Sequence, residues 1–194
     1  EEQVRLNEAW QLACQLAGTD REGLNHFAID SDIPLSAGLG GSAALSVSLV
    51  RLALSLLDSK VERPQRTAIA ALANQVEQLF HGVASGLDTA ACDADSPIRF
   101  SRSTGPLPLH LKGPSAWVVL IDSRERSSTR VQVERVAQLR LEQPTETEDY
   151  LATLGHLAES GVSLLEQCQW KKLGASLNAA QLALAGLGVS TLAI

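Results

Sequence analysis

The sequence predicts an α+β protein of two domains, and three features of the chain lead to this prediction. Apolar residues recur at helical spacing over several long stretches, which predicts amphipathic helices. Two shorter segments, residues 25–32 and 116–121, have the composition of strands. Four prolines punctuate residues 97–114, as expected at a boundary between domains. We therefore expect an N-terminal domain over residues 1–105 and a C-terminal domain over residues 106–194.

The N-terminal half has the patterns of three helices and one strand. Residues 3–17 carry apolar side chains at mixed helical spacing, and residues 25–32 alternate weakly, as a short strand does. A loop of small residues then leads into an apolar stretch that ends at Leu57, which predicts a helix buried within the domain. A further helix is expected over residues 64–80, because proline suits a first turn and Gly82 suits the position just past a helix end.

The C-terminal half begins with a strand pattern and continues with helices. Residues 116–121 (AWVVLI) are apolar throughout, which predicts a strand buried on both faces. Three helices are predicted after it, over residues 129–140, 145–168 and 170–185. Thr129 with Gln132, and Thr145 with Glu148, have the spacing of a capping box, which predicts a helix start at each threonine.

Composition and charge exclude several classes of protein. The 194 residues include 16 basic and 22 acidic side chains, a net charge of -6 without a Lys or Arg cluster, so nucleic acid is not an expected partner. The longest apolar stretch, residues 43–57, is interrupted by serines and Arg51 and is too short to cross a membrane, so no membrane partner is expected. The three cysteines form no CxxC pair, which indicates free buried thiols in a reducing cytoplasm. Because the sequence contains no methionine, we expect the chain to be part of a longer protein.

Residues 38–44 (GLGGSAA) form a glycine loop before a predicted helix, and four interpretations compete for it. A phosphate loop would direct backbone N–H groups and the helix dipole at an anion, with Ser42 placed to contact phosphate or Mg²⁺. A dinucleotide fingerprint needs a strand running straight into the first glycine, which is missing here. A nucleophile elbow is suggested by the order Ser42, Asp88, His110, but no strand leads directly into the serine. A turn of small residues that only allows close packing is the fourth interpretation, and the loop alone does not decide among them.

Two acidic residues, Glu77 and Asp88, flank a turn that contains Gly82 and Gly86. Glu77 lies in the last turn of a predicted helix, where the helix dipole disfavours a negative charge, so its position needs an explanation. Two converging carboxylates suit phosphoryl transfer, in which one holds Mg²⁺ and the other accepts the proton of a hydroxyl. The alternative is a solvated glutamate and an aspartate that caps a turn, which is the commoner case for an arbitrary pair.

Together the two segments resemble one family. Residues 33–44 (IPLSAGLGGSAA) are similar to the ATP-binding loop, P-x-x-x-G-L-G-S-S-A, of the GHMP small-molecule kinases. Residues 77–88, with the core H-G-x-x-S-G-x-D, are most similar to the mevalonate kinases within that superfamily. The segments Ser128–Arg130 and Leu187–Ser190 also look like that family, so the resemblance covers about residues 27–190.

The resemblance implies a two-domain kinase fold with the nucleotide in the cleft between the domains. It implies that Ser42 and Glu77 coordinate Mg²⁺ and that Asp88 is the catalytic base toward the substrate hydroxyl. It also places Thr129 near the phosphoryl and substrate groups. The phosphates of ATP would be bound by the loop residues Gly38, Leu39, Gly40, Gly41, Ser42 and Ala43.

The chain departs from the family pattern in its loop and at its two ends. Gly41 stands where the family has the first of two serines, which removes one hydroxyl from the loop. The family's first motif, which carries a lysine, would precede Glu1, and its third, glycine-rich motif would follow Ile194. We therefore expect the chain to be the central part of a kinase.

The implied function is ATP-dependent phosphorylation of mevalonate to phosphomevalonate, a step of isoprenoid precursor synthesis, by a cytoplasmic enzyme. Its expected partners are a small-molecule alcohol and a second copy in a homodimer. The alternatives are a phosphomevalonate, homoserine or sugar kinase of the same superfamily, a serine acyl hydrolase that uses Ser42, and a non-catalytic nucleotide-binding module.

Overall fold

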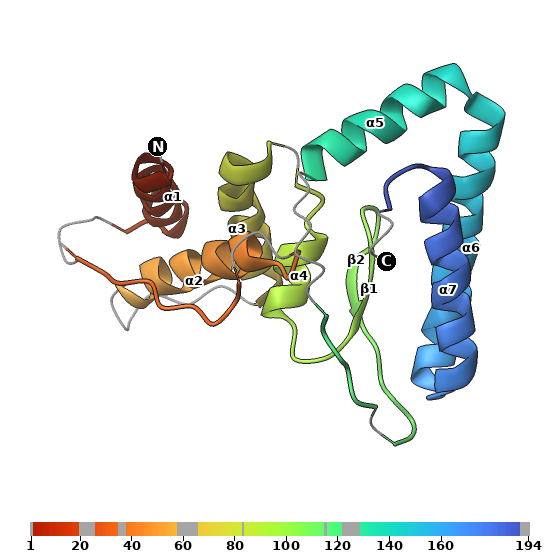
Figure 1. Ribbon diagram of the computed structural model, residues 1–194. Helices are drawn as coiled ribbons and strands as arrows, with labels where there is room; N and C mark the ends of the chain where they lie inside the picture. Colours follow the sequence, from red (N-terminus) through yellow and green to blue (C-terminus); the bar gives the residue numbers. More distant parts are fainter. Residues whose placement is uncertain are drawn as a thin grey trace. The chain divides into compact units, whose positions relative to one another are not determined.

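The computed structural model describes residues 2–19, 26–34, 38–57, 66–82, 84–114, 116–121 and 129–190. These residues form α-helices and one antiparallel pair of strands, so the predicted α+β class is confirmed (Figure 1). The chain divides into two compact units, Glu1–Pro108 and Leu109–Ile194. The assignment of a function to each domain stays a prediction.

The first unit contains four helices and a hairpin. Its elements are α1 (Glu2–Ala17), α2 (Gly41–Ser55), α3 (Arg66–His81), α4 (Leu87–Asp93), β1 (Ile98–Ser101) and β2 (Gly105–Pro108). Helices α1, α2 and α3 pack against one another, and α4 packs against α2 and α3. The three helices predicted for this half are therefore confirmed. The Pro64 position predicted at the start of α3 lies outside the described residues.

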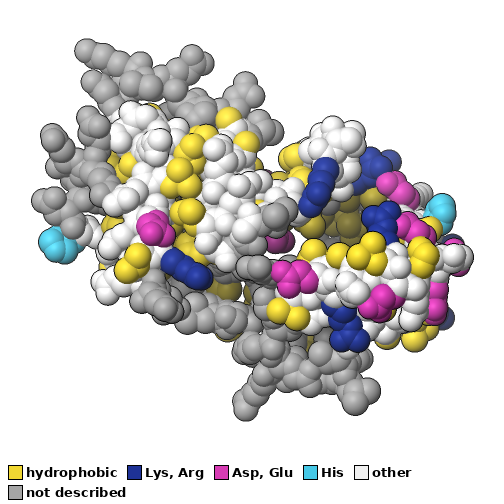
Figure 2. Space-filling model, turned by 90° about the horizontal axis from the view of Figure 1, so that it is seen from above, with side chains coloured by type: hydrophobic (Ala, Val, Ile, Leu, Met, Phe, Trp, Pro, Cys, Tyr) yellow, Lys and Arg dark blue, Asp and Glu magenta, His cyan; other side chains and the backbone are white. Residues whose placement is uncertain are grey.

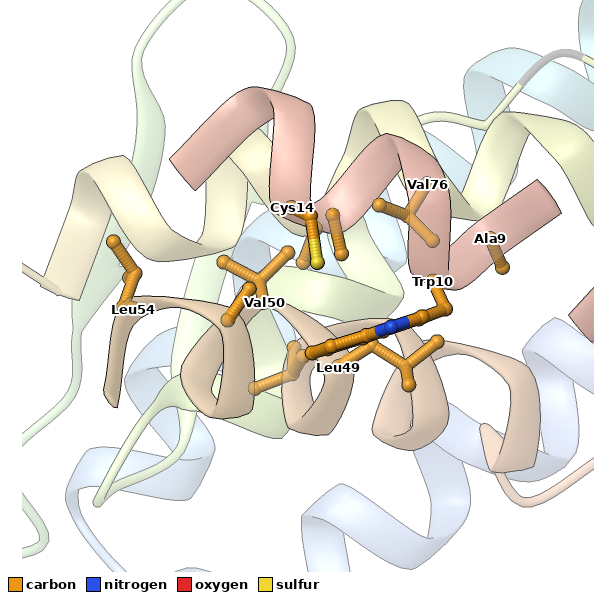
Figure 3. Packing of buried hydrophobic residues seen from close by; sticks show 11 residues of the cluster. Ala9, Trp10, Cys14, Leu49, Val50, Leu54 and Val76 are labelled. Atoms are coloured by element: carbon orange, nitrogen blue, oxygen red, sulfur yellow. The ribbon is translucent and has the colours of Figure 1, made fainter. Parts of the chain in front are cut away.

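The core of this unit lies between α1, α2 and α3. Trp10 and Cys14 of α1 face Leu49 and Val50 of α2, with Val76 of α3 beside them (Figure 3). Helix α2 buries side chains on several faces, which confirms the prediction of a buried helix. Burial of apolar surface stabilises a fold by roughly 25 cal/mol per Å². This core therefore holds α2 against α3, the two helices that carry the candidate site.

Helix α4 is held by an ion pair that the sequence did not reveal. Arg51 Nη2 on α2 contacts Asp93 Oδ1 at 2.5 Å, and the Asp93 side chain is only 4% exposed. A buried carboxylate requires such a partner, because an unpaired buried charge is costly. The pair therefore anchors the C-terminal end of α4 to α2. The hairpin that follows pairs Ile98 with Pro108 and Ser101 with Gly105.

Both strands predicted outside this hairpin are wrong. The described residues 26–34 form no strand, although Phe27 packs its ring against Trp10 with centroids 5.3 Å apart. Residues 116–121 are likewise not a strand, and Trp117 is 98% exposed, so this segment is not buried on either face. A run of apolar residues indicates a tendency toward burial, but a strand also needs a neighbouring strand with which its backbone forms hydrogen bonds. In the described residues the only ladder is that between β1 and β2.

The second unit is helical and consists of α5 (Thr129–Glu142), α6 (Pro144–Glu166) and α7 (Trp170–Gly186). Helix α6 packs against both α5 and α7, and the three predicted helices are confirmed. The backbone N–H of Lys112 donates to the carbonyl of Glu166 at 2.8 Å, which ties the segment after the hairpin to the end of α6.

The capping box predicted at Thr145 is wrong. Gln143 is the N-cap of α6 and Pro144 occupies its first turn, so the helix begins before the threonine. Glu148 instead accepts a hydrogen bond from Arg140 Nε at 2.5 Å. The capping box predicted at Thr129 falls on a side chain outside the described residues.

The surface carries charges of both signs, and the three cysteines differ in their exposure. On the face shown in Figure 2, basic and acidic side chains of the described residues are interspersed and do not gather into a basic patch. Within the described ranges, no helix is both long and apolar enough to cross a membrane. The three cysteines are free, as predicted, but only Cys14 is buried, whereas Cys92 is exposed and Cys168 is half-buried.

Candidate active site

The glycine loop turns the chain directly into α2. Gly38 and Gly40 have φ angles of 73° and 70°, in the left-handed region that favours glycine. Gly40 is the N-cap of α2, and its carbonyl accepts the first helical hydrogen bond from Ala44 N at 2.9 Å. The N–H groups of the first helical turn have no intrahelical partner, so this turn can bind an anion. The dinucleotide fingerprint lacks its leading strand here too, because the described residues 26–34 form none.

Adjacent glycines of this loop give a matched test of its geometry. We expect Gly40→Ala to lower the free energy of unfolding by about 1–2 kcal/mol, because a side chain at φ 70° is strained. Gly41→Ala should change it little, since Gly41 is helical and an added Cβ would meet Ile33 at 3.5 Å, an ordinary contact. Urea unfolding of both variants measures the difference. Equal stability of the two would show that the left-handed turn is not required.

Glu77 of α3 is clamped by two serines of α2. Ser42 Oγ donates to Glu77 Oε1 at 2.7 Å, and Ser46 Oγ donates to Glu77 Oε2 at 2.9 Å. Glu77 is 3% exposed, so the interpretation of a solvated glutamate is wrong. The two hydroxyls also explain why a carboxylate is tolerated near the end of α3, since a buried charge needs hydrogen bonds. Sequence reasoning missed Ser46; its spacing of four from Ser42, one helical turn, was the available signal.

The donor set around Glu77 fits a magnesium ion. Carboxylate and hydroxyl oxygens are hard ligands, and Mg²⁺ in phosphate-binding sites is held by one or two carboxylates together with phosphate oxygens. Ser42 is half-buried in the first turn of α2, beside the glycine loop, so this oxygen pair lies next to the anion-binding turn. The described part of the chain holds no group of three or more His, Cys, Asp or Glu side chains that could bind a metal.

Asp88 lies at the start of α4, a seven-residue helix that was not predicted. Gly86, with φ 89°, is the N-cap of this helix, and the Asp88 side chain is exposed in the first turn. A Cβ at Gly86 would meet the Asn74 side chain of α3 at 3.6 Å, which shows how closely the turn approaches α3. The turn between Glu77 and Asp88 thus returns the chain to the helix that carries Glu77.

Cys92 connects these parts of the site. It lies one turn after Asp88 on α4, and its Sγ contacts the carbonyl oxygen of Gly40 at 3.9 Å. Partial burial raises the pKa of the Cys92 thiol, and the negative charges of Asp88, Glu77 and Asp93 raise this pKa further. Cys92 therefore contacts the glycine loop and lies within electrostatic range of Glu77 and Asp88. Sequence reasoning treated Cys92 only as a free buried thiol.

Two of the residues singled out from the sequence have side chains that the structure does not describe. Thr129 begins α5 in the second unit, and its side chain lies outside the described residues, so its predicted place near the substrate stays a prediction. The side chain of His81 is likewise not described. For the serine hydrolase interpretation, Ser42 would have to donate to an imidazole, whereas its hydroxyl donates to the Glu77 carboxylate.

Comparison with known proteins finds related kinases. Residues 5–94 match the family "GHMP kinases N terminal domain". The chain is similar to the mevalonate kinase of Thermococcus gammatolerans, with 29% identity over 192 residues that cover 96% of this chain and 55% of the relative. It is also similar to the mevalonate kinase of Pyrococcus abyssi, with 29% identity over 168 residues that cover 84% of this chain and 48% of the relative. The mevalonate kinase of Schizosaccharomyces pombe is 30% identical over 180 residues, covering 84% of this chain and 44% of the relative. The chain spans about half the length of these relatives.

Proposed function

We propose that this chain, whose residues 5–94 belong to the GHMP kinase N-terminal domain family, is part of an ATP-dependent kinase that phosphorylates the hydroxyl of a small molecule. The observation that carries the proposal is the pair of hydrogen bonds from Ser42 and Ser46 to Glu77, of which Ser42 directly follows the glycine turn. An anion-binding turn beside a fixed carboxylate is what the binding of a phosphate with its cation requires.

The glycine loop, Ser42, Glu77 and Asp88 would then each have a chemical role in the transfer. The N–H groups of the loop from Gly38 to Ala43 would bind the phosphates of ATP, and Ser42 with Glu77 would hold Mg²⁺. Mg²⁺, when bound, neutralises charge on the phosphates. Asp88 would accept the proton of the substrate hydroxyl. The oxygen of that hydroxyl then attacks the γ-phosphorus, and the bond between this phosphorus and the oxygen of the leaving ADP breaks.

We further propose mevalonate as the substrate, with phosphomevalonate as the product. The relatives that carry the name mevalonate kinase match most of this chain, from both archaea and fungi. The Glu77-to-Asp88 segment, which in sequence is most similar to mevalonate kinases, begins near the end of α3 and ends in the first turn of α4. A homodimer and a cytoplasmic location stay predictions.

A substrate panel tests this assignment on the complete protein. We expect ATP consumption with mevalonate at a higher kcat/KM than with phosphomevalonate, homoserine or galactose. Omission of Mg²⁺ should abolish the reaction with every acceptor. ATP binding without consumption of any acceptor would instead identify a non-catalytic module, and a preference for another alcohol would correct the substrate within the superfamily.

A further inference from the structure

We propose that Ser46 is a positioning residue for the metal-binding carboxylate of Glu77, an inference that rests on the proposed kinase function. Ser42 and Ser46 are one turn apart on α2, so their side chains leave the same face of the helix. Each serine donates to a different carboxylate oxygen, Ser42 to Oε1 at 2.7 Å and Ser46 to Oε2 at 2.9 Å. The carboxylate is therefore fixed at both oxygens by one helix.

The two hydrogen bonds differ in their access to a ligand. Ser42 is half-buried in the first turn, beside the glycine loop, so a metal or phosphate at the loop can compete for its oxygen. Ser46 is fully buried, at 0% exposure, and its neighbour Val47 is also buried, at 3% exposure, so these two side chains of α2 are shielded from solvent. A ligand at the loop does not reach the Ser46 bond. That bond therefore persists while Ser42 changes its partners, and it keeps Oε1 of Glu77 directed toward the loop.

A purely structural role for Ser46 makes a different prediction. Glu77 is 3% exposed, so a hydroxyl that only satisfies the buried charge would affect folding stability and nothing else. A hydroxyl that orients a metal ligand also affects metal affinity, because hydrogen bonds to such ligands fix their geometry. Metal affinity measured on folded protein separates the two roles.

The experiment uses Mn²⁺ as the probe on the complete protein, with a non-hydrolysable ATP analogue, and follows bound Mn²⁺ by electron paramagnetic resonance. We expect Ser46→Ala to weaken Mn²⁺ binding about 10–100-fold, as is typical when a partner of a metal ligand is removed. Ser46→Thr keeps the hydroxyl and should restore most of the affinity. In activity assays, Ser46→Ala should raise the KM for Mg²⁺ while saturating Mg²⁺ recovers most of kcat. Ser48→Ala, at an exposed serine of the same helix, is the control and should bind Mn²⁺ like the wild type.

Each outcome has a distinct meaning. Folded Ser46→Ala protein with wild-type Mn²⁺ affinity overturns the positioning role, whatever its stability. If Ser46→Ala does not fold, Ser46→Cys replaces it, because a thiol keeps the volume but donates weakly; unchanged Mn²⁺ affinity in that variant overturns the proposal. Wild-type protein that binds Mn²⁺ with the analogue but transfers no phosphate refutes the proposed function and leaves the test of Ser46 valid. Wild-type protein that binds no Mn²⁺ removes the metal site itself and overturns the positioning role with it.

Discussion

Asp88→Asn in the complete protein is expected to lower kcat about 10²–10⁴-fold, the contribution typical of a positioned general base. Asparagine keeps the size of the side chain at the first turn of α4 but cannot accept the substrate proton. Because Asp88 is exposed and is separate from the serine clamp on Glu77, ATP binding should be unchanged. Steady-state kinetics and calorimetric titration with an ATP analogue measure the two quantities separately.

The same variant has a second readout, at Cys92, that does not depend on turnover. The charge of Asp88 raises the pKa of the Cys92 thiol, so its removal should lower that pKa. More thiolate is then present at a fixed pH below the pKa, and alkylation by iodoacetamide should become faster. Asp149→Asn, at an exposed site on α6, is the control and should leave both kcat and alkylation unchanged. Full turnover with Asp88→Asn would show that another group is the base.

The longer helices were predictable because their apolar residues recur at helical spacing over many residues and each helix packs on a neighbour. Helix α1, for example, spans 16 residues and buries Trp10 and Cys14 against α2. Helix α4 was not predictable, because seven residues carry too little periodicity. It packs against α2 and α3, and the ion pair of Arg51 with Asp93, residues 42 positions apart in the sequence, anchors its end. Such long-range pairing is decided by the tertiary structure.

The strand predictions failed for a related reason. Residues 116–121 have a composition typical of a buried strand, yet their side chains are exposed in the structure. Composition reports a tendency toward burial, whereas strand formation depends on a neighbouring chain that donates and accepts hydrogen bonds. The sequence of a single segment carries no information about that neighbour, so the segment alone could not show whether it forms a strand.

The candidate site was partly predictable. The position of Glu77 against the helix dipole signalled that a partner was needed, and the glycine loop supplied Ser42 as a candidate. Ser46 was missed because a serine within an apolar helix resembles a small packing residue. Only the structure shows that its hydroxyl is directed at Glu77. Cys92 was missed for a different reason, because its contact with Gly40 joins residues 52 positions apart in the sequence.

Glu77→Gln should remove the chemistry of the site while leaving the fold in place. Glutamine matches glutamate in size, its amide oxygen can accept one serine hydrogen bond, and its amide nitrogen can donate to the other hydroxyl. The lost charge removes the proposed metal ligand, so we expect turnover to fall by about three orders of magnitude, as loss of several kcal/mol of metal stabilisation implies. Steady-state kinetics at saturating ATP and Mg²⁺ measures this loss.

Glu77→Ala separates that chemical loss from a structural one. Alanine removes both acceptors and leaves the hydroxyls of Ser42 and Ser46 without the carboxylate, so the free energy of unfolding should fall by about 1–3 kcal/mol. Glu8→Gln, at an exposed site on α1, is the matched control and should alter neither turnover nor stability. If Glu77→Gln kept full turnover while Glu77→Ala was destabilised, Glu77 would be a buried structural acid. If Glu77 is a metal ligand, the glutamine variant should fold like the wild type and lack activity. The reason is that the charge of Glu77 would bind the metal of the nucleotide, whereas its hydrogen bonds to the serines stabilise the fold.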